Sequence, residues 1–207
     1  MAHYFENDPN LKDEKGSYQV RWQEGTFTIL TNSGIFSRGG LDTGTRVLLD
    51  AIAASDEAPK RILDFGCGTG VAGVLLHSLY PQAEIMGIDV SERAADMARE
   101  NYGKAGIHGE VLVQDGLKEE DGLFDLIALN PPIRTGKETI YRLFQEASEH
   151  LTQDGSLWIV IRKQHGAASA QKYLQSLDLD VNRVARDLGF WVLKVTRKEE
   201  QSSAQTK

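Results

Sequence analysis

The sequence predicts an α/β fold in which a mostly parallel sheet ends in one antiparallel hairpin. From residue 61 onward, short apolar strands alternate with segments of helical spacing, as a parallel sheet with crossover helices requires. Near the C-terminus, residues 181–186 and 190–196 are both strand-like, and the short stretch between them cannot form a crossover helix. These last two strands must therefore run antiparallel to each other.

The elements can be placed in chain order. After a polar arm over residues 1–16, two strand-like runs flank Glu24-Gly25 and predict a hairpin. The predicted strands are residues 17–21, 26–31, 61–65, 84–88, 110–113, 124–129, 157–161, 181–186 and 190–196. The predicted helices are residues 45–52, 71–80, 92–104, 138–151 and 168–177, with Asp42 or Thr43 capping the first and Ser91 the third.

Length and composition bound the organisation of the chain. A length of 207 residues fits one domain with a modest extension. We expect an arm, hairpin and loop over residues 1–44, packed on an α/β domain over residues 45–198, and a flexible tail over residues 199–207. A single cysteine, Cys67, excludes a disulfide framework and a structural zinc site. No apolar run approaches the roughly 20 residues of a membrane helix, and the N-terminus is too polar for a signal peptide. We expect a cytoplasmic monomer without bound metal.

Charge is unevenly distributed along the chain. The formal net charge is −7, from 23 basic and 30 acidic side chains. Residues 1–133 hold 11 basic and 21 acidic residues, a sum of −10, whereas residues 134–207 hold 12 and 9, a sum of +3. The net charge disfavours a polyanionic partner, but the basic second part leaves nucleic acid open as a partner.

A glycine-rich loop, Asp64-Phe65-Gly66-Cys67-Gly68-Thr69-Gly70, joins the first parallel strand to its helix. Such a loop commonly binds a nucleotide-like cofactor at the carboxyl end of the sheet, although it can also be a simple tight turn. The spacing Gly68-x-Gly70-x-x-Gly73, with Asp89 further on, satisfies a dinucleotide fingerprint and keeps a dehydrogenase as an alternative. Asp64 would repel a pyrophosphate but suits the ammonium group of S-adenosylmethionine, so we predict the sulfonium cofactor.

Acidic residues end the next two strands. Asp89 can accept hydrogen bonds from two ribose hydroxyls, or it can serve the helix that begins after Ser91. Asp115 is placed for an adenine amino group, with the Gly116 amide on a ring nitrogen, although Asp-Gly is also a common turn. The predicted cofactor-binding residues are Asp64, Gly66, Gly68, Gly70, Asp89, Val90, Asp115, Gly116 and Asn130.

The run Leu129-Asn130-Pro131-Pro132-Ile133 follows the fourth parallel strand. Its two prolines fix the backbone, leaving the Asn130 amide oxygen and the Pro131 carbonyl as acceptors in one rigid place. Two acceptors that grip the hydrogens of an sp² amine aim its lone pair at the sulfonium methyl. We therefore predict catalytic roles for Asn130, Pro131 and Pro132, the alternative being a double-proline strand terminator.

With these residues the chain resembles the class I S-adenosylmethionine-dependent methyltransferases. Within them it resembles the ribosomal small-subunit methyltransferase C group, which methylates guanine N2 in rRNA. The resemblance runs from His3-Tyr4-Phe5 to about Arg197, and its narrower signals are Ser33-Gly34-Ile35-Phe36-Ser37, Leu41-Asp42-Thr43-Gly44-Thr45, Arg134-x-Gly136-Lys137 and Trp158-Ile159-Val160-Ile161. It implies a Rossmann-like, seven-stranded sheet with a reversed last strand, S-adenosylmethionine as cofactor and small-subunit rRNA as partner.

One residue departs from the pattern of the family. Many amino-methylating enzymes have Tyr or Phe after the prolines, where this chain has Ile133. Phe36 is the candidate for stacking on the target base, unless it is a core residue. The larger members also carry a duplicated domain before the catalytic one, which the first 60 residues of this chain are too short to supply.

Basic residues follow the fourth and fifth parallel strands, at the edge where an α/β sheet binds ligands. We predict that Arg134, Lys137 and Arg162 bind substrate, together with Ile133 and Phe36. Arg142 and Lys163 lie nearby in the sequence and are either further phosphate contacts or solvated side chains.

The predicted reaction is methyl transfer to an exocyclic amine, guanine N2 of small-subunit rRNA. Two alternatives remain at this point. One is a methyltransferase acting on a protein glutamine amide, because that amine needs the same pair of acceptors. The other is a non-catalytic cofactor-binding module that assists RNA processing.

Overall fold

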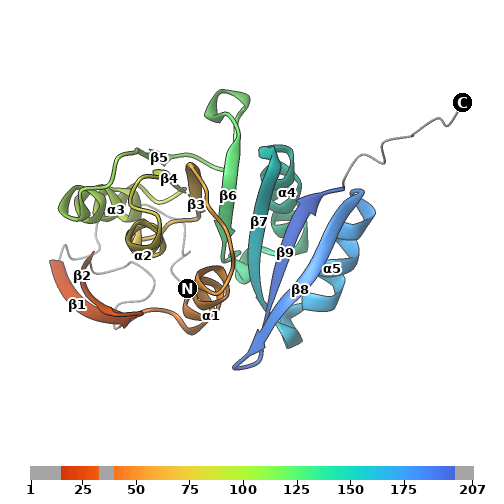
Figure 1. The fold of residues 1–207 in the computed structure, drawn as a ribbon, viewed down its shortest axis with the longest axis horizontal. Helices are drawn as coiled ribbons and strands as arrows, with labels where there is room; N and C mark the ends of the chain where they lie inside the picture. Colours follow the sequence, from red (N-terminus) through yellow and green to blue (C-terminus); the bar gives the residue numbers. More distant parts are fainter. Residues whose placement is uncertain (1–14, 33–39, 199–207) are drawn as a thin grey trace, which may run out of the picture.

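The computed structural model describes residues 15–32 and 40–198, which form two sheets with helices packed against them (Figure 1). The small sheet is the predicted hairpin, in which β1 (Lys15–Trp22) pairs antiparallel with β2 (Gly25–Asn32). The large sheet consists of β3 (Arg61–Phe65), β4 (Glu84–Asp89), β5 (Val111–Val113), β6 (Phe124–Leu129), β7 (Leu151–Arg162), β8 (Leu179–Asp187) and β9 (Phe190–Arg197). The predicted tail, most of the predicted arm and Phe36 lie outside the described residues.

The strand directions confirm the predicted topology. In the large sheet the order is β5-β4-β3-β6-β7-β9-β8. Strands β3 to β7 run parallel, whereas β9 is antiparallel to both of its neighbours, β7 and β8. The chain places β4 on one side of β3 and β6 on the other, and such a reversal opens a ligand crevice at the carboxyl ends of the strands. This edge, which we call the carboxyl edge, lies toward the bottom of Figure 1, where the β8–β9 turn is drawn.

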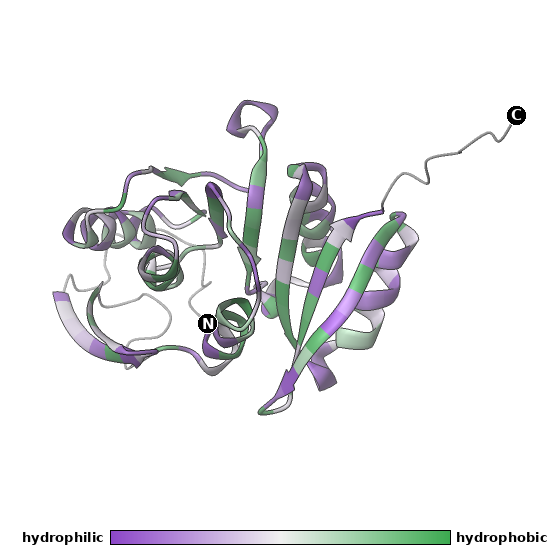
Figure 2. Ribbon diagram, in the orientation of Figure 1, coloured by the Kyte–Doolittle hydropathy of each residue, from purple (hydrophilic) through white to green (hydrophobic). Residues whose placement is uncertain are grey.

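Helices cover both faces of the large sheet. They are α1 (Thr43–Ala53), α2 (Val71–Leu79), α3 (Glu92–Ala105), α4 (Lys137–Glu149) and α5 (Ala167–Ser176). Neighbouring strand residues alternate between two cores, so that Ile62 belongs to the cluster under α1, α2 and α3, and Leu63 to the cluster under α4 and α5. Figure 2 shows hydrophobic residues concentrated on the central strands, which are buried on both faces.

The boundary between α4 and β7 corrects the sequence prediction. Leu151 is not the end of the helix but the first residue of β7, where it pairs with Phe124. The helix ends at Glu149, and the Arg197 guanidinium from β9 donates to the Leu151 carbonyl at 2.9 Å. The polar residues 152–155 concealed the first part of this strand, because they interrupt the apolar pattern that predicts a buried strand.

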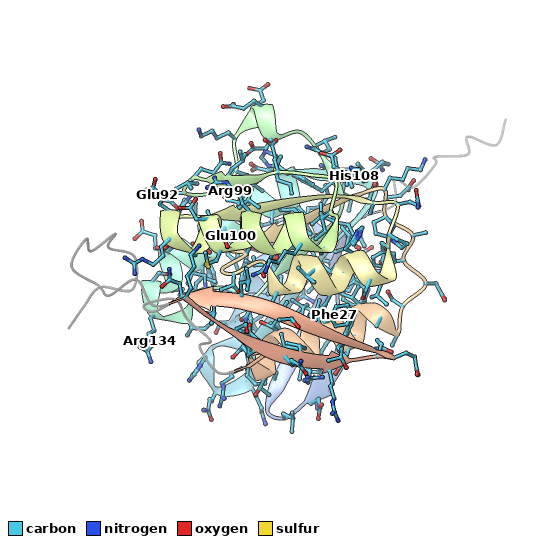
Figure 3. The ribbon with its side chains drawn as sticks, turned by 90° about the vertical axis from the view of Figure 1, so that its left-hand side faces the viewer. Phe27, Glu92, Arg99, Glu100, His108 and Arg134 are labelled. Atoms are coloured by element: carbon cyan, nitrogen blue, oxygen red, sulfur yellow. The ribbon has the colours of Figure 1, made fainter. Side chains whose placement is uncertain are left out.

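The hairpin is tied to the large sheet through α1 and α3. Trp22 donates its indole N–H to Asp50 Oδ1 of α1 at 2.7 Å. On α3, the Asn101 amide exchanges hydrogen bonds with the Leu30 backbone and also donates to the Thr69 carbonyl at 2.8 Å. In Figure 3 the hairpin runs below α3, and β2 contacts this helix. Asn101 therefore connects the hairpin to the glycine-rich loop.

No helix among residues 15–32 and 40–198 is long and apolar enough to cross a membrane.

Candidate active site

Three neighbouring strands of the large sheet end at the same level. In the register of the sheet, Phe65 of β3 pairs with Ile88 of β4 and with Leu129 of β6. The residues that follow these three are Gly66, Asp89 and Asn130. The fold therefore brings the glycine-rich loop, the acidic end of β4 and the Asn-Pro-Pro run together at the carboxyl edge, as the sequence predicts.

The glycine-rich loop leaves an open face at this edge. Its Gly66 and Cys67 amides donate to the Ile88 carbonyl at 2.8 and 2.9 Å, which fixes the loop against β4. Gly66 and Gly68 have positive φ angles of 76° and 54°, and a Cβ atom added to either would meet no other atom within 4 Å. Backbone and empty space at these positions suit a ligand that approaches the main chain closely. The loop thus fits the predicted cofactor.

Gly70 and Gly73, unlike Gly66 and Gly68, lie against other side chains. Gly70 precedes α2, and a Cβ there would lie 3.0 Å from Ala98 Cβ on α3. At Gly73, an added Cβ would lie 2.0 Å from the Tyr102 hydroxyl. These two glycines allow α2 and α3 to pack closely, so the cofactor-binding role predicted for Gly70 remains a prediction.

Asp64 is a buried carboxylate at the base of the loop, with only 4% of its surface exposed. Its Oδ2 accepts the Gly73 N–H at 2.9 Å and lies 3.5 Å from the Tyr102 hydroxyl. Burial raises the pKa of Asp64 to about 7, and the nearby charge of Asp89 adds to the increase. The structure thus gives Asp64 a local function, joining β3 to the first turn of α2. Its predicted contact with the cofactor ammonium remains a prediction.

Asp89 holds two backbone segments together. Its Oδ2 accepts the Gly68 N–H at 2.8 Å, and its Oδ1 accepts the Ser91 N–H at 2.9 Å. Ser91 in turn caps α3, because its hydroxyl accepts the Ala94 N–H at 3.3 Å. Burial raises the pKa of Asp89. Each carboxylate oxygen can accept a second hydrogen bond, so Asp89 and the adjacent, half-buried Val90 remain compatible with a bound ribose.

Asp115 follows β5 and is paired with a cation. The Arg142 guanidinium on α4 contacts Asp115 Oδ1 at 2.6 Å and Glu146 Oε1 at 2.7 Å. Glu146 also accepts the Leu117 N–H at 3.0 Å, so α4 anchors the loop around Gly116. Arg142, considered above as a phosphate contact, is instead engaged by these two carboxylates. The adenine contact predicted for Asp115 and Gly116 stays a prediction.

Asn130 follows the last residue of β6, and its side-chain amide is turned toward α1. Its Nδ2 donates to Asp42 Oδ2 and to Thr45 Oγ1, each at 3.0 Å. Asp42 is the N-cap residue of α1, and its Oδ2 also accepts the Thr45 N–H at 3.0 Å. From the sequence, Asp42 is only one of two candidates for capping this helix, because nothing in the local pattern pairs it with a residue so distant in the chain.

The two prolines and Ile133 continue from Asn130 into a short 3₁₀ turn. The carbonyl of Pro132 accepts both the amide and the hydroxyl of Thr135, at 3.0 and 2.7 Å. Pro131 is buried, and its carbonyl remains the predicted second acceptor. Ile133 is half-buried and packs against the core under α4, and its contact with substrate stays a prediction.

Exposed cations line the carboxyl edge beyond Asn130. Lys137 Nζ lies 5.0 Å from the centre of the Tyr141 ring, and the Arg162 guanidinium lies 4.8 Å from the Phe190 ring. Arg134 projects from the surface in Figure 3. Within residues 15–32 and 40–198, none of these three forms an ion pair with a carboxylate.

Two further arginines were missed by the sequence analysis. Arg183 and Arg186 on β8 lie over the Trp191 ring of β9, at 4.3 and 5.1 Å from its centre. They also have no carboxylate partner in the described part of the chain. The signal was present as two basic residues on an edge strand opposite a tryptophan, but the pairing register of β8 and β9 was needed to see it.

Fold and site together define a class I S-adenosylmethionine-dependent methyltransferase. A seven-stranded sheet with a reversed strand, a glycine-rich loop after β3 and an acid at the end of β4 are its shared features. The chain belongs to the methyltransferase small domain family, whose sequence profile matches residues 26–194. Family membership confirms the predicted fold and the predicted cofactor, S-adenosylmethionine.

Named relatives cover the chain to different extents. A Bacillus subtilis protein described as uncharacterized protein YbxB is 36% identical over 198 residues, covering 94% of this chain and 98% of that protein. The ribosomal RNA small subunit methyltransferase C of Haemophilus influenzae is 37% identical over 161 residues, covering 75% of this chain. Those residues make up 48% of the Haemophilus enzyme, so the chain spans about half the length of that relative.

Solved structures share the fold. A 16S rRNA N2 methyltransferase from T. thermophilus, solved in complex with AdoMet and guanosine, superposes with a TM-score of 0.75 at 20% identity, covering 92% of this chain and 52% of that one. A ribosomal protein L11 methylase from Lactobacillus delbrueckii gives a TM-score of 0.64 at 23% identity, covering 77% and 85% of the two chains.

Proposed function

We propose that this methyltransferase transfers its methyl group to an exocyclic amine, guanine N2 of small-subunit rRNA. The orientation of Asn130 carries the proposal. Its Nδ2 is used by Asp42 and Thr45, which leaves Oδ1 as the acceptor on the opposite side of the amide. Because Asn130 follows the strand next to the glycine-rich loop, that acceptor lies at the edge where the cofactor would bind.

The chemistry required of the chain is placement of a weak nucleophile. S-adenosylmethionine, when bound, supplies an electrophilic methyl group on a sulfonium that leaves as a neutral thioether. Asn130 Oδ1 and the Pro131 carbonyl would each accept one N–H of the target amine, which holds its lone pair toward the methyl carbon. The N–C bond forms as the S–C bond breaks, and the amine loses one proton to solvent.

An RNA substrate is favoured by the cations of the carboxyl edge. Arg134, Lys137 and Arg162 lie on the Asn130 side of the sheet and have no carboxylate partner among the described residues. Such side chains are free to neutralise phosphates. The Haemophilus relative is named as an enzyme of small-subunit rRNA, and the structural neighbour from T. thermophilus was solved with guanosine. These observations together support the proposed substrate.

A protein substrate is the second candidate, because the Lactobacillus neighbour is a methylase of a ribosomal protein. The test is to incubate the protein with tritiated S-adenosylmethionine and total ribosomal RNA, or with total ribosomal protein, and to digest the labelled RNA to nucleosides. We expect label in RNA that co-migrates with N2-methylguanosine. Label on protein alone would contradict the RNA assignment, and label on a ribose or a ring nitrogen would contradict the exocyclic amine.

A further inference from the structure

An asparagine that grips a target amine must be oriented correctly. Its side chain ends in one oxygen and one NH₂ group of nearly the same shape, and only the oxygen can accept a hydrogen from an amine. If the amide of Asn130 were rotated by half a turn, its NH₂ would face the N–H groups of the target. Donor would then face donor, and the acceptor that the reaction requires would be lost. Something in the protein has to choose between the two orientations.

The partners of Asn130 make that choice. A carboxylate accepts hydrogen bonds but has none to donate, so of the two ends of the Asn130 amide only Nδ2 can bond to Asp42 Oδ2, 3.0 Å away. With the amide reversed, its oxygen would lie against the carboxylate oxygen, and two acceptors would repel each other. A hydrogen bond to a charged acceptor is also stronger than one between neutral groups.

Thr45 supports the same orientation. Its hydroxyl lies 3.4 Å from Asp42 Oδ2 and 3.0 Å from Asn130 Nδ2. The hydroxyl can donate its one hydrogen to Asp42 and then present a lone pair to Asn130. Asp42 is the N-cap residue of α1 and Thr45 lies in its first turn, and α1 packs on β7, the strand beside β6. The side-chain amide of Asn130 is therefore held by the N-terminus of a helix that is packed on the sheet.

We propose that Asp42, with Thr45, is a positioning residue that fixes the orientation of the Asn130 amide so that Oδ1 faces the methyl acceptor. The inference rests on the proposed function, in which Asn130 Oδ1 grips an exocyclic amine. Asp42 does not touch the reacting atoms, and its capping of α1 is a separate contribution to the stability of the helix.

Two variants of Asp42 separate positioning from capping. In Asp42→Asn, the new amide oxygen can replace Oδ2 toward both Thr45 and Asn130. In Asp42→Ser, the hydroxyl can still cap α1, since Ser is among the preferred N-cap residues, but its side chain is too short to reach Asn130. We expect kcat for RNA methylation to fall about tenfold or more in Asp42→Ser, because a reversed Asn130 amide loses its hydrogen bond to the target amine. In Asp42→Asn, kcat should stay within about threefold of wild type.

Three measurements accompany these rates: the affinity for S-adenosylhomocysteine by calorimetry, KM for RNA, and the melting temperature. Positioning predicts that Asp42→Ser changes kcat while the other three remain near the wild-type values. An unchanged kcat in Asp42→Ser would overturn the proposal. So would a loss of kcat that comes with an equal loss of cofactor affinity, or an equal loss of kcat in Asp42→Asn.

A spectroscopic readout keeps this test distinct from that of the proposed function. The side-chain NH₂ signals of Asn130 are identified by their disappearance in Asn130→Ala, and their exchange with water is measured by NMR. We expect slow exchange in wild type and Asp42→Asn, and exchange at least about tenfold faster in Asp42→Ser, because only Asp42→Ser leaves Asn130 Nδ2 without an acceptor oxygen from residue 42. Equal exchange rates in the wild type and both Asp42 variants would overturn the proposal that Asp42 holds the Asn130 amide. Slow exchange in a wild type that methylates no RNA would instead overturn the proposed substrate alone.

Discussion

The two halves of the large sheet hold their charged groups in different ways. On the β3–β4 side, buried carboxylates bond to backbone amides, as Asp64 does to Gly73 and Asp89 to Gly68. On the β7–β8 side, arginines lie over aromatic rings, as Arg162 does over Phe190. The buried carboxylates of the first side suit a cationic cofactor, and the exposed arginines of the second side suit a polyanion. Asn130 lies between them, on β6.

This contrast explains why the overall charge is a poor guide to the partner. The net charge of −7 sums every charged residue of the chain, so it hides both the buried acids near the loop and the exposed cations at the other side of the edge. The following predictions act first at the boundary between the two sides, then on the acidic side, and last on the cationic side.

The largest expected effect is at the boundary between the two sides. Asn130→Ala removes the proposed amine acceptor, and we expect kcat for RNA methylation to fall about 100-fold or more, as when one preorganised hydrogen-bonding group is removed from an active site. Affinity for S-adenosylhomocysteine should stay close to that of wild type. A variant that retains more than about a third of the wild-type kcat would show that Asn130 is not the acceptor.

The next effect tests packing on the acidic side. In Gly73→Ala, the new Cβ would lie 2.0 Å from the Tyr102 hydroxyl, which is buried, so we expect a loss of about 1–3 kcal/mol in the free energy of unfolding. Gly103→Ala is the matched control, because a Cβ at that position in α3 meets nothing within 4 Å. The control should be neutral or more stable by up to about 1 kcal/mol. Equal urea midpoints for the two variants would refute the close contact between α2 and α3.

The pKa of Asp64 predicts a pH dependence of cofactor binding. Burial raises this pKa to about 7, and a cationic ligand prefers the ionised carboxylate. Affinity should therefore be full above the pKa and should weaken by up to about tenfold per pH unit below it. Calorimetric titration with S-adenosylhomocysteine between pH 6 and about 8.5 measures the change. In Asp64→Asn the dependence should disappear, and an identical slope in both proteins would assign the titration to another group.

A smaller effect is expected from the two arginines over Trp191. In the Arg183→Gln/Arg186→Gln double variant, KM for RNA should rise about three- to tenfold at moderate salt, and the slope of log affinity against log salt should shrink by about 1.5, the value for two phosphate contacts. Lys60→Gln/Lys104→Gln removes the same charge from exposed positions away from the carboxyl edge. If both double variants weaken RNA binding equally, β8 contributes only net charge.

Much of the fold could be predicted because the strands and helices are short and regular. Buried parallel strands such as β3 and β6 are continuous apolar runs, and each helix begins where the spacing changes. The start of β7 could not be predicted, because Leu151 is held there by Phe124 and Arg197, which are distant in the sequence.

The candidate site shows the same division. Loops that follow parallel strands meet at one edge, so Gly66, Asp89 and Asn130 could be predicted to be neighbours from the sequence alone. Contacts that depend on the direction of a side chain could not be predicted from the sequence. Asp42 lies 88 residues from its partner Asn130, and Arg142 pairs with Asp115, 27 residues earlier in the chain.

The central claim is that the oxygen of Asn130 grips the target amine, and a crystal structure of the protein with S-adenosylhomocysteine and guanosine tests it most directly. The measured quantity is the distance from Asn130 Oδ1 to guanine N2. We predict a hydrogen bond of about 3 Å, with Nδ2 still on Asp42 and the base edge turned toward the sulfur. A guanosine bound with N2 outside hydrogen-bond reach of Asn130, or with Nδ2 turned toward the base, would contradict the account.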